Sequence, residues 1–231
     1  LIDLIIVLDI IDYHMCGILS IFKSTSINKN DVKSFLEKLK LLQHRGNDGF
    51  GISYNYDYAI IKKGLIKNCD LSDILNFDDT IPSKTIMGHT RYITSGKKDN
   101  NVYQPILGHS RFGKFSLIYN GNIYLNNYKN IATHLSFNDD IDNVVDTEFI
   151  IKYIENESYK TKYTEFYQIL IQFINTFDRA FSIIISIDNT LYALKDVYNM
   201  RPLSYSYIDN MFVLSSESIV NELTSICIIS V

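Results

Sequence analysis

A cysteine that directly follows a methionine, at the start of an apolar run, is the feature that most restricts the folds open to this chain. Met15 precedes Cys16, and residues 17–22 (Gly-Ile-Leu-Ser-Ile-Phe) continue as a strand pattern. If Met15 is the initiator and is removed, Cys16 carries a free α-amine beside its thiol. An α-amine titrates near ~7.7–8.0 and a thiol near ~8.5, so the amine can accept the thiol proton. The pattern predicts a nucleophile at the head of a strand; the alternative is a buried structural cysteine.

Composition narrows the class of protein further. At 231 residues the chain is long enough for one large domain or two small ones. The net charge of −4 at pH 7 and the pI near 5.7 predict no nucleic-acid partner. Three cysteines are present, and Cys69 and Cys227 have no Cys or His nearby, so we expect no metal and no disulfide framework. These features favour a reducing, cytoplasmic location.

Residues 1–15 are interpreted as an N-terminal extension to a domain that spans residues 16–231. Their apolar run contains Asp3 and Asp9 and is shorter than the ~20 residues that a membrane span requires. It also lacks the basic start and the small-residue cleavage site of a secretory signal. The extension is therefore either translated upstream sequence or a removable propeptide, with an added strand as the remaining alternative. We expect no membrane partner.

Periodicity along residues 16–231 predicts one α+β domain. Residues 30–43 carry apolar side chains at helical spacing, with Asn30 or Asp31 as the cap, so a helix is expected there. Two further helical patterns occupy residues 144–156 and 162–177. Short β-rich runs predict strands over residues 17–23, 50–55, 58–66, 86–92, 115–120, 180–187, 190–196, 203–208 and 211–215.

Seven further motifs follow Cys16 in a fixed order along the chain. They are His44-Arg45-Gly46-Asn47-Asp48-Gly49, the segment 88–96, Gln104-Pro105, Asn120-Gly121-Asn122, Asp146-Thr147-Glu148, Arg201-Pro202-Leu203 and Ser216-Glu217-Ser218. In this order and at these separations, the set resembles the class II glutamine amidotransferases, whose glutaminase domain is an N-terminal-nucleophile hydrolase. It is most similar to the glutaminase half of amidophosphoribosyltransferase. The resemblance runs from Cys16 to about Ser218.

The resemblance implies a fold, an activity and partners. The fold is a four-layer α/β/β/α sandwich with two stacked antiparallel sheets, formed by a type 2 glutamine amidotransferase domain over residues 16–231. The activity is hydrolysis of L-glutamine to glutamate and ammonia without a cofactor. A synthase domain or subunit would accept the ammonia, since we expect this chain to lack the phosphoribosyl-transfer domain. A homo-oligomeric state stays open.

The resemblance also assigns the catalytic residues. Cys16 is the nucleophile, and its freed α-amine is the base. Asn120 would donate its side-chain amide, and Gly121 its backbone N–H, to the developing oxyanion. A glycine suits this task because it lets the backbone approach the substrate closely. The alternative for Asn120-Gly121 is a simple hairpin turn.

Four more residues are expected to bind the substrate. Arg91 matches the arginine that pairs with the glutamine α-carboxylate, a bidentate task that lysine does badly. Asp146 matches the carboxylate that holds the α-ammonium, Thr94 would add hydrogen bonds, and Arg45 would brace the site. The alternatives are a surface ion pair for Arg91, a helix N-cap for Asp146 and a helix-terminal charge for Arg45. His44 and His89 are interpreted as structural.

Two other functions remain open. Asn120-Gly121-Asn122 and the two residues after it lean slightly toward the asparagine-synthetase type of glutaminase. A non-catalytic domain that binds glutamine or scaffolds a partner would follow if Cys16 is never exposed as an N-terminus. The mass of the mature N-terminus distinguishes this last function from a glutaminase.

Overall fold

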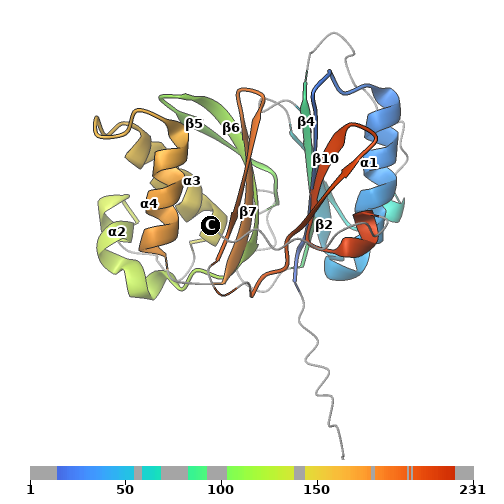
Figure 1. Ribbon diagram of the computed structural model, residues 1–231. Helices are drawn as coiled ribbons and strands as arrows, with labels where there is room; N and C mark the ends of the chain where they lie inside the picture. Colours follow the sequence, from blue (N-terminus) through green and yellow to red (C-terminus); the bar gives the residue numbers. More distant parts are fainter. Residues whose placement is uncertain are drawn as a thin grey trace, which may run out of the picture.

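Two antiparallel sheets stacked face to face form the centre of the molecule, and helices cover both outer faces (Figure 1). The computed structural model describes residues 15–54, 59–68, 83–92, 103–137, 144–177, 180–196, 198 and 200–221. Helix α1 (Lys29–Leu41) lies outside the first sheet, and the helices α2 (Lys129–His134), α3 (Asp146–Ser158) and α4 (Phe166–Thr176) lie outside the second (Figure 1). The expected four-layer α/β/β/α sandwich is therefore confirmed.

The first sheet has six strands in the order β3-β2-β4-β1-β10-β9, and each neighbouring pair is antiparallel. Its strands are β1 (Gly17–Lys23), β2 (Gly49–Tyr54), β3 (Ala59–Lys63), β4 (Thr85–Arg91), β9 (Ser204–Ile208) and β10 (Met211–Ser215). Gly17 pairs with Thr90, so the start of β1 lies beside the end of β4. This register brings the residue before β1, which is Cys16, next to Arg91.

The second sheet has four strands in the order β5-β6-β7-β8, again antiparallel throughout. Its strands are β5 (Ile106–Ser110), β6 (Gly113–Gly121), β7 (Phe181–Ile187) and β8 (Thr190–Lys195). Asn120 and Gly121 pair with Ser182 and Phe181 of β7, about sixty residues away along the chain. They are therefore strand residues, and the hairpin-turn alternative for this dipeptide is wrong.

The helices cover the sheets with apolar faces. Among the described residues they are α1 (Lys29–Leu41), α2 (Lys129–His134), α3 (Asp146–Ser158) and α4 (Phe166–Thr176). In α1 the side chain of Asn28 accepts hydrogen bonds from the nitrogens of Asn30 and Asp31 and so caps the helix. The chain then tightens into a 3₁₀ turn, η1 (Gln43–Arg45). Further 3₁₀ turns are η2 (Ile66–Asn68), η5 (Leu125–Tyr128) and η7 (Ser218–Asn221).

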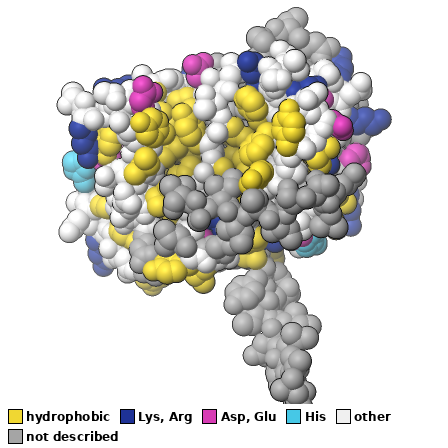
Figure 2. All heavy atoms as spheres, in the orientation of Figure 1, with side chains coloured by type: hydrophobic (Ala, Val, Ile, Leu, Met, Phe, Trp, Pro, Cys, Tyr) yellow, Lys and Arg dark blue, Asp and Glu magenta, His cyan; other side chains and the backbone are white. Residues whose placement is uncertain are grey.

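Apolar side chains fill three layers. One cluster lies between α1 and the first sheet, and a larger aromatic cluster lies between the second sheet and α2, α3 and α4. The third joins the sheets and contains Ile18, Met87, Ile118, Ile184, Leu203 and Leu214. Its margin is only partly buried, and Figure 2 shows apolar side chains gathered between the two halves of the molecule. Close packing on both sides of each sheet fixes the strand ends that carry the candidate site.

Most predicted elements are confirmed, with some corrections. The helix expected over residues 30–43 begins at Lys29, and its cap is Asn28 rather than Asn30 or Asp31. It ends at Leu41, and Gln43 belongs to η1 instead. β5 and α2 were not predicted, because β5 is a short edge strand and α2 has six residues and no side-chain cap.

Among the described residues, no helix has the length and apolarity that crossing a bilayer requires. Residues 1–14 lie outside the described part of the chain, so the extension stays a prediction.

Candidate active site

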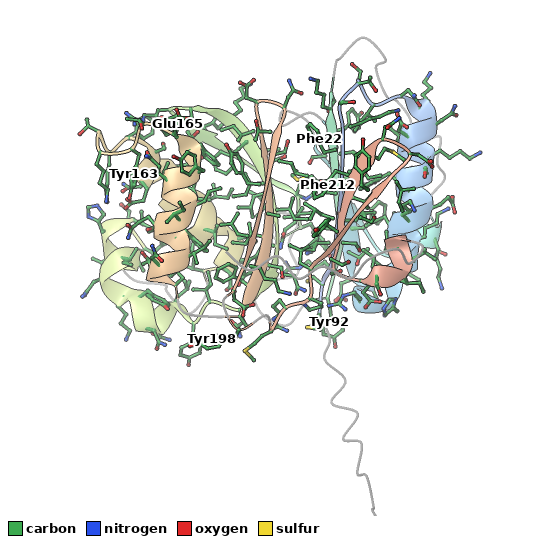
Figure 3. The ribbon with its side chains drawn as sticks, viewed as in Figure 1. Phe22, Tyr92, Tyr163, Glu165, Tyr198 and Phe212 are labelled. Atoms are coloured by element: carbon green, nitrogen blue, oxygen red, sulfur yellow. The ribbon has the colours of Figure 1, made fainter. Side chains whose placement is uncertain are left out.

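A pocket at one end of the sandwich collects four of the predicted site residues. Its lining residues are Cys16, Arg91, Tyr92, Gln104, Tyr119, Gly121, Val145, Asp146 and Thr147. Figure 3 places Tyr92 at the lower end of the molecule, at the opposite end from Phe22 and Phe212. The pocket therefore lies where β1 begins and where β4 and β6 end, with the first turn of α3 beside it.

Cys16 is partly buried just before the first residue of β1. Its Sγ lies 3.7 Å from the carbonyl oxygen of Tyr92, to which the thiol donates. Burial raises the pKa of the Cys16 thiol, while the Tyr92 contact and the charges of nearby arginines, Arg91 first, act in the opposite direction. A thiol with a raised pKa is a poor nucleophile by itself and needs a base to take its proton.

Arg45 holds the backbone of the nucleophile. Its Nε donates to the carbonyl oxygen of Cys16 at 3.1 Å, and its Nη1 donates to Oε1 of Glu217 at 2.6 Å. The same Glu217 oxygen lies 3.0 Å from Nε2 of His44. The Arg45 side chain is 9% exposed, so this ion pair is largely shielded from water. Arg45 and Glu217 thus form a clamp that joins Cys16 to the motif at residues 216–218.

Asn120 and Gly121 end β6 beside the nucleophile. Asn120 is 3% exposed, and its Nδ2 has no hydrogen-bond partner among the described residues. Such a buried donor is costly unless a ligand accepts from it. Gly121 has no room for a side chain, because a Cβ there would lie 2.7 Å from Oη of Tyr119 and 2.8 Å from the carbonyl oxygen of Ala180. The end of β6 therefore presents an amide N–H group of Asn120 without a described acceptor, next to the backbone of Gly121, which no side chain covers.

Arg91 is the last residue of β4 and is 6% exposed. Its guanidinium carbon lies 5.8 Å from the centre of the Tyr103 ring, a cation–π distance, and Tyr103 donates to the carbonyl oxygen of Asp48 at 3.2 Å. Burial lowers the pKa of Arg91, but an arginine stays charged at neutral pH. The predicted alternative of a surface ion pair is wrong, since the side chain is buried in the pocket wall.

Asp146 is the first residue of α3, and the N-cap is Val145. The Asp146 carboxylate instead accepts through Oδ2 from the Tyr119 hydroxyl at 3.0 Å and from the nitrogen of Ile123 at 2.8 Å. The N-cap alternative for Asp146 is therefore wrong. Burial raises the pKa of this carboxyl group, whereas the two bonds and the Arg91 charge act against the rise. Among the described lining residues, the pocket thus contains one cation and one carboxylate.

Some site residues had not been predicted, and one predicted residue cannot be placed. Tyr119 and Thr147 line the pocket without having been assigned a role, although Thr147 belongs to a motif that was recognised. Gln104 also lines it and accepts from the nitrogen of Tyr119 at 2.5 Å. Thr94 lies outside the described residues, as do Cys69 and Cys227.

The histidines that the structure describes are not among the residues that line the pocket. His89 is fully buried, and burial, with a smaller contribution from Arg91, lowers its pKa to about 3. It is therefore neutral, which fits its interpretation as structural. Within the described ranges, no group of three His, Cys, Asp or Glu side chains could hold a metal ion.

Comparison with known proteins identifies the family of the chain. The family described as "Glutamine amidotransferase domain" matches residues 89–220, more than half of the chain. Amidophosphoribosyltransferase 1, chloroplastic, of Arabidopsis thaliana is 30% identical over 172 residues, which cover 71% of this chain and 28% of that protein. Glutamine–fructose-6-phosphate aminotransferase (isomerizing) of Listeria innocua is 30% identical over 207 residues, which cover 88% of this chain and 32% of that protein.

A solved structure supports the same fold. Glutamine phosphoribosylpyrophosphate amidotransferase from B. subtilis superimposes with a TM-score of 0.68 at 22% identity, over 89% of this chain and 42% of that one. The chain thus spans less than half the length of each of these three proteins. The sequence match, the shared sandwich and the motif order agree, and this chain belongs to the glutamine amidotransferase domain family, with amidophosphoribosyltransferases among its relatives.

Proposed function

We propose that this domain hydrolyses L-glutamine to glutamate and ammonia through Cys16. The observation that carries the proposal is the convergence of Cys16, Gly121, Arg91 and Asp146 on one pocket. The pocket offers a thiol for the side-chain amide of glutamine, and a cation and a carboxylate for its zwitterionic head. The names of the relatives, which include a glutamine–fructose-6-phosphate aminotransferase, support the same substrate.

The reaction requires that the nitrogen of Cys16 become a free amine. Met15 precedes Cys16 in the 231-residue chain, so that nitrogen belongs to a peptide bond until the chain is processed. Once residues 1–15 are removed, the amine accepts the thiol proton and the thiolate attacks the amide carbon of glutamine. The amide nitrogen leaves as ammonia after taking that proton, and a glutamyl thioester remains. Water then attacks the thioester, which releases glutamate and restores the thiol.

The strand end at Asn120 and Gly121 would stabilise the oxyanion in both steps. The buried Nδ2 of Asn120 has no partner among the described residues and is free to donate to developing charge. The missing side chain of Gly121 leaves its backbone accessible to the substrate. Arg45 would keep the carbonyl group of Cys16, and with it the thiol and the amine, in a fixed orientation.

Recognition of the amino-acid head would depend on Arg91 and Asp146. We assign the α-carboxylate to Arg91 and the α-ammonium to Asp146, with Thr94 as a further donor. The ammonia would pass to a synthase domain or subunit, in line with the relatives, which are longer than this chain. The free thiol favours a reducing compartment such as the cytoplasm.

Ammonia release from a protein that begins at Cys16 tests the proposal. This protein should hydrolyse glutamine, whereas Cys16→Ala and the form that retains Met15 should not. Mass spectrometry verifies each N-terminus, and a diazo-ketone analogue of glutamine should label Cys16 alone. Equal ammonia release with Met15 retained would exclude the amine as the base. If the protein that begins at Cys16 binds glutamine but does not hydrolyse it, the result would instead support a non-catalytic binding domain.

A further inference from the structure

The Tyr119 hydroxyl is bonded to the carboxylate that faces the pocket. Oη of Tyr119 lies 3.0 Å from Oδ2 of Asp146, and the nitrogen of Ile123 lies 2.8 Å from the same oxygen. Tyr119 is 3% exposed, and both Tyr119 and Asp146 line the pocket. A hydroxyl has one proton, and an ionised carboxylate only accepts, so Tyr119 is the donor in this bond.

This pairing fixes one oxygen of Asp146. Oδ2 accepts from two protein donors, on β6 and just after it, so its orientation is set from the second sheet. The backbone of Asp146 itself also donates to the carboxylate, and the residue lines the pocket. The Tyr119 hydroxyl uses its one proton in the bond to Asp146, and it therefore presents only lone pairs to the pocket that it lines.

The Tyr119 ring also packs over Gly121. Tyr119 and Gly121 lie two residues apart and so on the same face of β6. The space above Gly121 is filled by this ring, since a Cβ there would lie 2.7 Å from Oη and 2.8 Å from Cζ of Tyr119. The Tyr119 backbone is held too, because its nitrogen donates to Oε1 of Gln104 at 2.5 Å. The hydroxyl therefore lies between Gly121, at the end of β6, and Asp146.

We infer that Tyr119 is a positioning residue that makes Asp146 selective for a substrate α-ammonium group. It orients the carboxylate through Oδ2 beside the pocket that both residues line, and its own lone pairs offer the ammonium group a second acceptor. An ammonium group carries three donors and needs such a set of acceptors, whereas an analogue without the amine gains nothing from them. This inference rests on the proposed function, because it takes Asp146 as the anchor of the glutamine head.

The test compares glutamine with glutaramate, which has hydrogen in place of the α-amine. In the protein that begins at Cys16, Tyr119→Phe removes one oxygen and keeps the ring against Gly121. Loss of a hydrogen bond to a charged group should lower kcat/KM for glutamine roughly ten- to hundredfold, mainly through KM. The kcat/KM for glutaramate should stay within about twofold, because its binding never used this group.

Two further variants separate this role from a structural one. Tyr153→Phe is the matched control, since Tyr153 is also buried but its hydroxyl contacts Thr176 at 3.5 Å, away from the pocket residues. It should leave unchanged the ratio of kcat/KM for glutamine to kcat/KM for glutaramate. Asp146→Asn should lower that ratio, and adding Tyr119→Phe to it should lower the ratio little further, because Tyr119 acts through Asp146.

Calorimetry with the Cys16→Ala protein measures binding without turnover. It therefore distinguishes the positioning role of Tyr119 from the proposed hydrolysis of glutamine through Cys16. A Tyr119→Phe change that weakens glutamine and glutaramate equally, or weakens neither, overturns the inference while glutaminase activity stands. Glutamine that binds but is not hydrolysed by the Cys16 form refutes the catalytic proposal alone, and the binding ratio still decides the role of Tyr119. If neither compound binds, the assignment of Asp146 fails, and the inference fails with it.

Discussion

Replacing Gly46 with alanine should destabilise the protein through a clash with strand β4. Gly46 has φ −155° and ψ 114°, an extended conformation that any residue adopts. A Cβ there would lie 2.4 Å from the carbonyl carbon of Thr90 and 2.5 Å from the nitrogen of Arg91. These are backbone atoms of a strand that is paired on both sides, with β1 and β2. They cannot rotate away as the end of a flexible side chain would.

The size of the effect follows from this geometry. The η1 turn and β4 must separate by about 1 Å before the contact reaches the 3.4 Å of ordinary packing. Overpacking costs about 1–3 kcal/mol, and a backbone obstacle places Gly46→Ala at the upper end. The lower entropy of the unfolded alanine chain returns about 0.4–1 kcal/mol. We expect the free energy of unfolding to fall by about 2–3 kcal/mol and KM for glutamine to rise, because Arg91 moves with β4.

Gly64 is the control, because glycine is favoured there by the backbone conformation and not by a lack of space. Its φ is +86°, and a Cβ there would meet nothing within 4 Å. The left-handed conformation costs an alanine about 1–2 kcal/mol, so after the same entropy correction Gly64→Ala should cost about 0–1.6 kcal/mol. Asparagine tolerates this conformation, so Gly64→Asn should cost less than Gly64→Ala. At Gly46 asparagine should cost more than alanine, because it is larger.

Urea unfolding of the four variants and the unchanged protein, with the midpoint and slope fitted for each, measures these differences. Two rankings matter: Gly46→Ala against Gly64→Ala, and asparagine against alanine at each position. A Gly46→Ala protein as stable as Gly64→Ala would refute the steric argument. An asparagine at Gly46 that costs less than alanine would also refute it, since only a conformational requirement produces that order.

Three further predictions concern the site. Asn120→Ala should lower kcat for glutamine about a hundredfold with little change in KM, measured by steady-state ammonia release, because it removes an oxyanion donor. Arg91→Lys should mainly raise KM in the same assay, because lysine loses the planar fork. Burial raises the pKa of Glu217, but its bonds from Arg45 and His44 outweigh this and lower that pKa. The stabilisation is therefore complete above the ordinary glutamate pKa of about 4.3 and disappears as pH falls through the lowered folded-state pKa. Denaturation of Glu217→Gln and the unchanged protein between pH 7 and 3 should show their difference shrinking with acidity.

Local patterns were sufficient for most of the secondary structure. The helical spacing that includes Phe35 and Leu39 predicted α1, and the structure buries both side chains against the first sheet. Strands such as β1 and β7 were predicted because their side chains alternate or are apolar throughout. These signals succeed because a helix or strand depends on neighbours within a few residues. Where the local signal is weak, as at β5 and α2, prediction failed.

Motif order also indicated which residues share a site, but not what each contacts. Cys16, Arg91, Gly121 and Asp146 were predicted to act together, and all four line the pocket. Periodicity places a residue on a face of its own strand or helix and does not say which other element that face meets. The N-cap interpretation of Asp146 therefore failed, because the decisive contact comes from β6.

The sequence by itself thus determined most of the helices and strands, the family and four of the residues that line the pocket. Only the tertiary structure decided which distant groups pair within the site. Tyr119 reaches Asp146 across 27 residues, and Arg45 reaches Glu217 across 172. Both pairs exist because β1 lies between β4 and β10 and because β6 ends beside α3. Strand order and register are set by the packing of the whole chain, so no local stretch of sequence encodes these contacts.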